Sequence, residues 1–353
     1  MSRLTQLMAL GAVAATLAAG ACSESTAPPA VDPTAMATAV TTLNTSLAQN
    51  QVFQSLAALD GTAALGAPVA RAIAAAQPLR AATRPPGSVW TAEAARTRTE
   101  LEAMARAPAA VTALFFSNVL GKTFQWDTTR PAGYRILDST LAGAPSNGVR
   151  FILYQTDTTG QPSLPLLQTG YLDLSDISNA SVNEVHLLLH VGSQKAADYT
   201  ITEQKTTASL SLTAAGYVVN VVGGGSRVNF TLSHVLALSD SSLSTSYQAN
   251  DGATAVSLVS QVSGTGATAV LTLDWSATNG GTVEIVGTNS VPAVNLAFKF
   301  NGATIATATG SQANATITPL TAPLAQLATI LTQLDDVYVN LSLLFAPGLL
   351  VFG

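Results

Sequence analysis

Charged side chains are scarce in this chain. Asp, Glu, Lys and Arg together make up 10% of its 353 residues, whereas about a quarter is typical of soluble proteins. Four lysines are present and the net charge is −5. A surface without basic clusters cannot neutralise a phosphate backbone, so we expect no binding to nucleic acid. Uncharged polar side chains must cover the surface instead, which suits an exported β protein.

Cysteine and catalytic motifs are also nearly missing. Cys22 is the single cysteine, which excludes a disulfide framework. The sequence has no Gly-x-Ser-x-Gly, no His-Glu-x-x-His and no phosphate-binding loop. None of the three histidines lies beside an obvious nucleophile. We therefore expect a protein that is not an enzyme and that carries neither a cofactor nor a metal.

An apolar segment follows a single positive charge at the N-terminus. Arg3 precedes the uncharged stretch Leu7–Ala19, which has the length of the hydrophobic region of a signal peptide. Small residues follow, at Ala19-Gly20-Ala21. This pattern predicts export, with residues 1–21 as the signal peptide.

The cysteine directly after these small residues extends that interpretation. Ala19-Gly20-Ala21-Cys22 resembles the lipobox of bacterial lipoproteins, whose cysteine is acylated and becomes the first residue of the mature chain. The resemblance covers only this N-terminal segment, and it implies a lipid anchor at Cys22 with a membrane as partner. Ser23 is similar to the residue found after the cysteine in lipoproteins passed on to an outer membrane. Ala19-x-Ala21 also fits ordinary secretory cleavage, which leaves a soluble secreted or periplasmic protein as the alternative.

The region after the cysteine changes from polar to helical. Residues 22–33 are short, polar and proline-containing, and we expect a disordered tether there. Residues 34–108 form an alanine-rich N-terminal region. Apolar residues recur at helical spacing on either side of Asn50, with a shift of phase between them, which predicts two short helices.

A third helix is expected over residues 92–106. Its Arg and Glu side chains are spaced four apart, as in ion pairs on a solvated helix surface. The apolar stripe of Ala95, Leu101 and Ala105 is thin. We therefore expect this helix to dock weakly.

Residues 109–353 are expected to form one antiparallel β domain with a C-terminal helix. Apolar and polar residues alternate along runs such as Phe230–Leu238 and Val294–Phe300, and turn signals such as Asn301-Gly302 separate the runs. The fold class is α+β and predominantly antiparallel β, with a meander of roughly 12 to 14 strands. We expect the meander to curl into a barrel or a two-layer sheet, since open sheets of this length rarely stay flat.

The expected C-terminal helix covers residues 321–346. Large apolar residues from Leu320 to Phe345 alternate spacings of four and three, so one face is strongly apolar. We expect this helix to pack on the sheet and to be interrupted at Pro347-Gly348. The apolar stretch Val337–Phe352 is then shorter than the about 20 residues that span a membrane.

The histidines are the first candidates for a functional site. His186 and His190 lie four residues apart in an expected strand, which separates their Cα atoms by about 13 Å and is too far to share one zinc ion. We expect them on a polar face. His234 falls on the apolar face of its strand, which predicts either a bulge near Ser233 or a hydrogen-bonded core histidine.

Carboxylates and glycines offer weaker candidates. Asp173 and Asp176 lack calcium-loop spacing, so we expect a solvated strand end. Asp335 and Asp336 are adjacent, and we expect both on the wet face of the C-terminal helix. Gly264-x-Gly266-x-x-Ala269 imitates part of a dinucleotide fingerprint, but no helix follows and we expect a hairpin.

Together these features predict a cell-envelope lipoprotein with a non-catalytic binding or structural role and an envelope protein as possible partner. The alternative is a carrier of hydrophobic or lipid ligands, because a curved antiparallel sheet closed by helices can enclose an apolar cavity. A cavity of at least about 300 Å³ would favour the carrier.

Overall fold

The computed structural model describes residues 32–58, 88–106, 114–129, 133–156, 161–221, 224–264, 270–290, 293–311 and 316–352. The chain divides into two compact units, Met1–Asp32 and Pro33–Gly353. The expected signal peptide and Cys22 lie outside the described residues. The expected boundary at residue 108 separates no units, because the helices before it and the sheet after it belong to the same one.

Fifteen strands form one sheet. From β3 to β15, neighbours in the sheet are neighbours in the chain, and β1 lies between β3 and the edge strand β2. Every pair is antiparallel except β1 with β3, which is parallel. The strands are β1 (Lys122–Asp127), β2 (Gly133–Arg135), β3 (Gly148–Tyr154), β4 (Gln168–Asp176), β5 (Asn183–Val191), β6 (Gln194–Lys205), β7 (Ser209–Asn220), β8 (Ser226–Ala237), β9 (Leu243–Asn250), β10 (Ala255–Ser263), β11 (Val270–Thr278), β12 (Thr282–Ser290), β13 (Val294–Phe300), β14 (Ala303–Gly310) and β15 (Thr316–Pro319).

The large antiparallel meander is confirmed, and its size exceeds the expectation. The two edge strands, β2 with three residues and β15 with four, are too short for an alternating pattern to reveal them. The loop chemistry is confirmed at Asn301-Gly302, where both residues have positive φ, 46° and 82°. A two-residue hairpin turn of type I′ requires this conformation, and Phe300 pairs with Ala303 around it.

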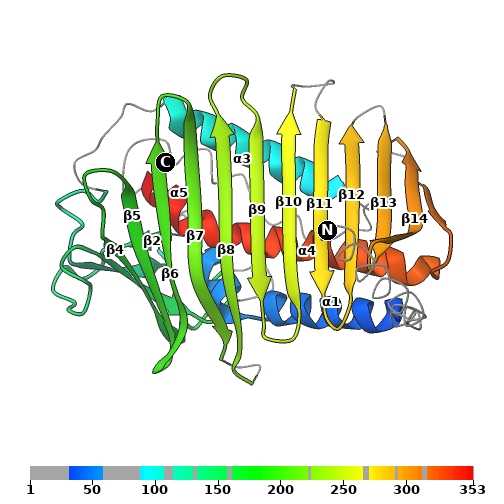
Figure 1. Cartoon of the computed structure of the whole chain (residues 1–353). Helices are drawn as coiled ribbons and strands as arrows, with labels where there is room; N and C mark the ends of the chain where they lie inside the picture. Colours follow the sequence, from blue (N-terminus) through cyan, green and yellow to red (C-terminus); the bar gives the residue numbers. More distant parts are fainter. Residues whose placement is uncertain are drawn as a thin grey trace, which may run out of the picture. The chain divides into compact units, whose positions relative to one another are not determined.

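The sheet is open. Its edge strands β2 and β15 do not pair with each other, so closure into a barrel is not confirmed. The strands stand side by side, and the helices cross behind them (Figure 1). These helices cover the face that would line a barrel, so the apolar side chains of the sheet are buried without closure.

The covering helices come from both ends of the unit. They are α1 (Pro33–Ala48), α2 (Gln51–Ala58), α3 (Ser88–Arg106), α4 (Leu324–Ser342), the 3₁₀ turn η4 (Leu343–Phe345) and α5 (Ala346–Phe352). α1 packs along α4. Asn44 of α1 donates to Gln333 Oε1 at 2.7 Å and accepts from Asn340 Nδ2 at 2.9 Å. These contacts join the first helix of the unit to the last long one.

The two N-terminal helices are confirmed, with the break at Asn50. The side-chain oxygen of Asn50 accepts a hydrogen bond from the backbone N–H of Val52 at 2.9 Å, which is the role of a helix N-cap. Val40, Leu43 and Val52 are fully buried. These helices therefore form part of the core.

The buried face of α3 differs from the expected stripe. Ala95 is exposed, and the buried residues are Ala94, Thr97, Glu100, Leu101 and Met104. Weak docking was expected because Ala95, Leu101 and Ala105 were assigned to the buried face. The face that is buried is a different and larger one. Two of the buried residues are polar, so a search for apolar spacing does not find this face.

The ion pairs of α3 form as expected, although not on a solvated surface. Arg96 donates to Glu100 at 2.6 Å and Arg98 to Glu102 at 3.1 Å. The side chain of Glu100 is only 8% exposed. The pair with Arg96 therefore offsets part of the cost of burying this carboxylate.

The C-terminal helix departs from expectation at both ends. Leu320 and Leu324 are 60% and 49% exposed, so the buried stripe begins at Leu327. At the other end, α5 continues the helical path through Pro347-Gly348. A Cβ on Gly348 would lie 2.8 Å from the side chain of Ile201, so glycine permits α5 to approach β6 closely.

Leu324–Phe352 is the one helical segment of the described residues that is long and apolar enough to cross a membrane. Of its most apolar window, 67% is buried inside the protein. Burial in the helix-covered core accounts for its composition.

A row of rings fixes α4 and η4 on the sheet. Trp275 stacks on Tyr338 at 5.7 Å between ring centroids, and Tyr338 stacks on Tyr247 at 4.9 Å. His234 contacts Tyr247 at 5.3 Å and Phe345 at 4.6 Å. The row therefore connects strands β8, β9 and β11 to the C-terminal helices.

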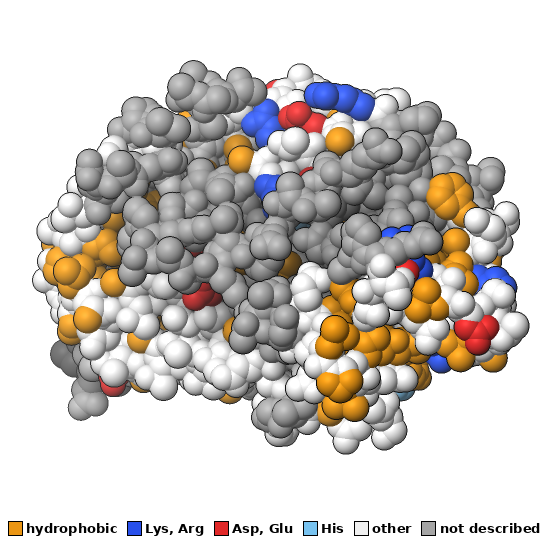
Figure 2. Space-filling view, turned by 180° about the vertical axis from the view of Figure 1, so that it is seen from behind, with side chains coloured by type: hydrophobic (Ala, Val, Ile, Leu, Met, Phe, Trp, Pro, Cys, Tyr) orange, Lys and Arg blue, Asp and Glu red, His pale blue; other side chains and the backbone are white. Residues whose placement is uncertain are grey.

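The surface is not uniform along the sheet. From behind, hydrophobic side chains gather toward the end that holds β2, β4 and β5, and charged side chains are few (Figure 2). Several exposed large hydrophobic residues belong to this part of the chain: Phe116, Leu137, Leu164, Leu167 and Ile177. This end is the more apolar part of the described surface.

Candidate functional site

His186 and His190 lie on the open face of the sheet, as expected. His186 Nε2 is 2.8 Å from Asp198 Oδ1, and the His190 ring stacks on Tyr171 at 4.7 Å. Among the described residues, no group of three or more His, Cys, Asp or Glu side chains could hold a metal ion.

Asp173 and Asp176 do not form a common site. Asp173 is buried and accepts two hydrogen bonds from the guanidinium of Arg150, at 2.6 and 2.7 Å. Asp176 accepts from the backbone N–H groups of Leu114 and Ser178. The expected solvated strand end is therefore wrong for Asp173, because a bidentate ion pair offsets the cost of its burial.

The expectation that Asp335 lies on the solvent-exposed face of the C-terminal helix is also wrong. It is buried at 6% exposure, whereas Asp336 is exposed as expected. α4 packs against α1, α3 and β15, so its buried arc is wider than a single stripe and includes position 335.

The glycine segment from Gly264 to Ala269 links β10 to β11. These strands pair antiparallel up to Ser263 and Val270. Residues 265–269 lie outside the described residues.

His234 is a core histidine. β8 pairs with β9 in continuous register through this position, without a bulge. The ring nitrogens of His234 lie 3.1 Å from Thr245 Oγ1 and 2.8 Å from the Tyr247 hydroxyl. Burial, with a smaller effect from the charge of Arg96, lowers the pKa of His234 from 6.5 to about 3. The imidazole is therefore neutral near pH 7.

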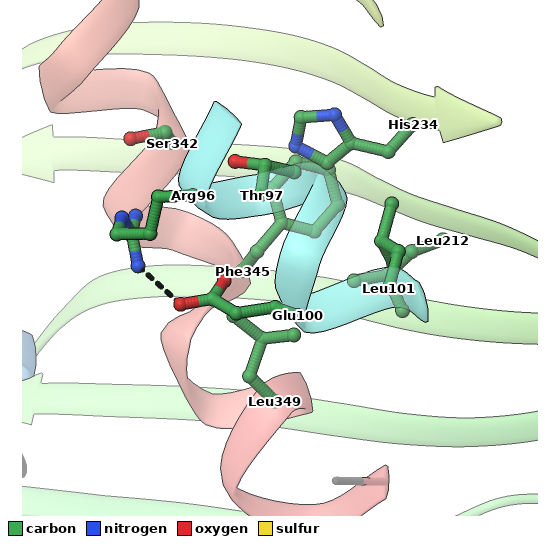
Figure 3. Close-up of a pocket in the computed structure, with 9 residues that line it drawn as sticks. All are labelled: Arg96, Thr97, Glu100, Leu101, Leu212, His234, Ser342, Phe345 and Leu349. Atoms are coloured by element: carbon green, nitrogen blue, oxygen red, sulfur yellow. Dashed lines mark hydrogen bonds and ion pairs between the residues drawn. The ribbon is translucent and has the colours of Figure 1, made fainter. Parts of the chain in front are cut away.

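A small pocket lies beside His234, between α3, the C-terminal helices and the sheet (Figure 3). Its free volume is about 10 Å³, which is about the room that one water needs. The lining residues are Arg96, Thr97, Glu100, Leu101, Leu212, His234, Ser342, Phe345 and Leu349. Small-molecule sites start at about 300 Å³, so this pocket is not a ligand cavity.

Ser342 and His234 both line this pocket but do not act as nucleophile and base in this arrangement. The Ser342 hydroxyl donates to the backbone oxygen of Val339 at 2.8 Å. Both nitrogens of His234 are engaged by Thr245 and Tyr247. The histidine thus holds β8 to β9.

The larger hollow is a groove on the open face, over β8, β9, β10 and β11. Its volume is about 390 Å³. Eight of its side chains lie on the open face, in two rows across these strands. One row is Asn229, Asn250, Ala255 and Thr278, and the other is Thr231, Gln248, Ser257 and Ser276. Seven of these eight are amides or hydroxyls and none is charged.

Small side chains on β10 account for the hollow. Ala255 lies directly between Asn250 of β9 and Thr278 of β11, and Ser257 lies between Gln248 and Ser276. β10 is therefore the floor of the groove, and longer side chains on β9 form one wall.

Several polar groups of the groove are available to a ligand. Thr231, Gln248, Ser257 and Ser276 make no side-chain hydrogen bond within the described part of the chain. Asn250 uses its Oδ1 to accept from the backbone N–H of Gly252 at 2.6 Å, and its Nδ2 stays available.

Charged groups gather elsewhere on the open face, on β3 to β6. Asp198 accepts one hydrogen bond from Lys195 at 2.7 Å and contacts His186 at 2.8 Å. Burial alone would raise the pKa of Asp198, but the hydrogen bonds from Lys195 and His186 outweigh it, and the pKa lies below its ordinary value. The groove is thus an uncharged region beside a charged one.

The groove was missed by reasoning from the sequence. Its residues are the outward members of alternating strands, and polar residues at outward positions are typical of any solvated sheet face. One signal in the sequence could have revealed the groove. At one end of β8, β9, β10 and β11, the outward positions all carry amide, hydroxyl or alanine side chains. No family model, curated protein or solved structure matches the chain.

Proposed function

We propose that this chain is an exported cell-envelope protein, anchored by a lipid at Cys22, that acts by binding through the open face of its sheet and performs no chemistry of its own. The anchor is supported by the sequence around Ala19-Gly20-Ala21-Cys22. A tether of residues 22–33 spans at most about 40 Å when extended. The ligand must therefore lie close to the membrane.

The open face is the observation that carries the proposal. Antiparallel sheets commonly bury one face and solvate the other. Here the solvated face extends over fifteen strands, and no described helix covers it (Figure 1). It contains the uncharged groove of about 390 Å³. A surface of this kind offers many hydrogen-bonding groups in a fixed arrangement.

The carrier alternative has no comparable support among the described residues. The enclosed pocket beside His234 has room for about one water. The groove is lined by polar side chains and is open to solvent. Acyl chains require an apolar enclosure, so we do not propose that function.

Fractionation of cells tests the anchor. Cys22→Ser should move the protein from the membrane fraction to the soluble one, because stable attachment needs the acyl chains. The control Ser23→Ala should remain in the membrane fraction. Retention of Cys22→Ser in the membrane, with the signal segment cleaved, would overturn the anchor.

Photo-crosslinking in intact cells tests the binding face. A photoreactive residue at Val259, on the open face, should give an adduct with an envelope component. The same residue at Thr38, exposed on α1, should not. Equal adducts from both positions, or none from Val259, would contradict the proposal.

A further inference from the structure

We infer that the groove over β8, β9, β10 and β11 binds a neutral, polyhydroxylated glycan. The inference rests on the proposed binding role of the open face, and it adds the class of ligand and the residues that contact it. Four features of the groove carry it: its charge, its hydrogen-bonding groups, the spacing of its rows and a neighbouring aromatic ring.

The groove has no charge to select an ionic ligand. None of its lining residues is charged. Arg227, the nearest cation in β8, donates to Asn229 and stacks on Tyr217. Glu284, one strand beyond Ser276, lies opposite Lys299. Asp274 lies on the open face two residues before Ser276, so the charges of both signs that surround the groove give it no excess of either sign.

The hydrogen-bonding groups match alcohols. An amide such as Gln248 offers both a donor and an acceptor, and the hydroxyls of Ser257 and Ser276 can do either. A sugar hydroxyl also donates and accepts. Since these side chains make no hydrogen bond within the described part of the chain, a glycan would engage them without displacing internal contacts.

The spacing of the groups suits a repeating ligand. Neighbouring strands lie about 4.8 Å apart, so the row from Thr231 through Gln248 and Ser257 to Ser276 presents one polar group at each step. The repeat of an extended β-linked polysaccharide is close to this interval. A glycan lying across the strands would therefore place about one sugar over each polar group of the row.

An aromatic ring lies beside the first row. Tyr217 of β7 is directly opposite Asn229 and is half-buried. The guanidinium carbon of Arg227 is 3.7 Å from its ring centroid, which holds the ring in place. Aromatic side chains with one wet edge suit ligands that have both apolar and polar surfaces, and a sugar ring is such a ligand.

A protein partner fits this groove less well. Protein interfaces depend on a few large apolar, aromatic or Arg anchors in desolvated pockets. The large apolar side chains of the lining, Phe230 and Val256, are buried on the helix-covered side. An open floor of Ala255 and Ser257 would contribute little to such an interface.

Calorimetric titration of the full-length protein, purified in detergent, with chitotetraose and cellotetraose tests the inference. We expect saturable binding of at least one of these neutral oligosaccharides. The cationic, fully deacetylated form of chitotetraose and an oligogalacturonate should bind at least tenfold more weakly. Stronger binding of either charged oligomer would show that the site selects charge.

Variants locate the site. Gln248→Leu should weaken binding about tenfold, which corresponds to about 1.4 kcal/mol. Ser257→Tyr should abolish binding by filling the floor. The matched control is Gln261→Leu, which changes an exposed glutamine of the same face outside the groove and should bind as the wild type does.

The outcomes separate this inference from the proposed function. No binding of either neutral oligosaccharide, or equal binding by Gln248→Leu and Gln261→Leu, overturns the glycan assignment. Crosslinking from Val259 to a protein alone would keep the open-face role and also overturn the assignment. Urea unfolding of each variant checks that loss of binding is not loss of folding.

Discussion

The two faces of the sheet share the same strands and differ in chemistry. On the helix-covered face, Leu232, Tyr247, Leu258 and Trp275 are fully buried. On the open face, the residues next to them are mostly Ser, Thr, Asn and Gln. Side chains alternate along a strand, so each strand contributes to both faces. The comparison teaches that stability and recognition can be changed separately by substitutions one residue apart.

The strongest test of the covered face is Leu331→Asp on α4. Leu331 is 3% exposed, so the variant leaves a cavity and buries an unpaired charge. We expect the free energy of unfolding to fall by at least about 3 kcal/mol, measured by urea denaturation. Thr332→Asp, on the exposed side of the same helix, should cost far less. Equal midpoints for the two variants would disprove the core assignment.

A smaller effect is expected where α1 meets α4. Asn44→Ala removes hydrogen bonds to Gln333 and Asn340 and leaves those groups to find other partners. We expect a loss of about 2 kcal/mol, again from urea unfolding. Thr42→Ala, exposed on α1, is the control and should lie within about 0.5 kcal/mol of the wild type.

Lowering the pH should lower the free energy of unfolding through His234 on the helix-covered face. Its pKa is 6.5 when unfolded and about 3 when folded, so between these values the unfolded state binds the additional proton. Stability therefore falls as the pH falls from about 6.5 toward 3, with a slope of at most about 1.4 kcal/mol per pH unit. The slope should be shallower in His234→Gln. Parallel slopes for both proteins between pH 4 and 6 would contradict the lowered pKa.

The smallest effect is expected on the open face. Val259 is 40% exposed and Leu258 is fully buried. Val259→Thr should change the free energy of unfolding by less than about 0.5 kcal/mol, whereas Leu258→Thr should cost about 2 kcal/mol or more. Chemical denaturation of the pair measures the difference between the faces at two adjacent residues. Similar losses would mean that the open face is covered.

Local patterns predicted the elements well. The alternation from Val228 to Leu236 predicted β8 and left two alternatives for His234, a bulge near Ser233 or a core position. The continuous register of β8 with β9 decides for the core position. The phase shift at Asn50 located the end of α1. Both signals depend on residues close together in the chain.

Features set by distant contacts were not predictable in the same way. Asp335 is buried because α1, α3 and β15 all meet α4, and a helical pattern cannot show how many neighbours a helix has. The openness of the sheet depends on helices filling its covered face. The groove depends on small side chains that three separate turns bring side by side, so no local pattern reveals it.

The link between Asn44 and Asn340 has a consequence for folding. From β3 onward each strand pairs with a strand that is its neighbour in the chain, so the pairing of these strands needs only local contacts. α1 must wait for α4, because its hydrogen-bonded partner lies 296 positions later. A polypeptide without α4 would expose the apolar face of the sheet that the C-terminal helices normally cover. Exposed apolar surfaces of this kind promote aggregation. The helix-covered face is therefore completed only when α4 docks against α1 and the sheet.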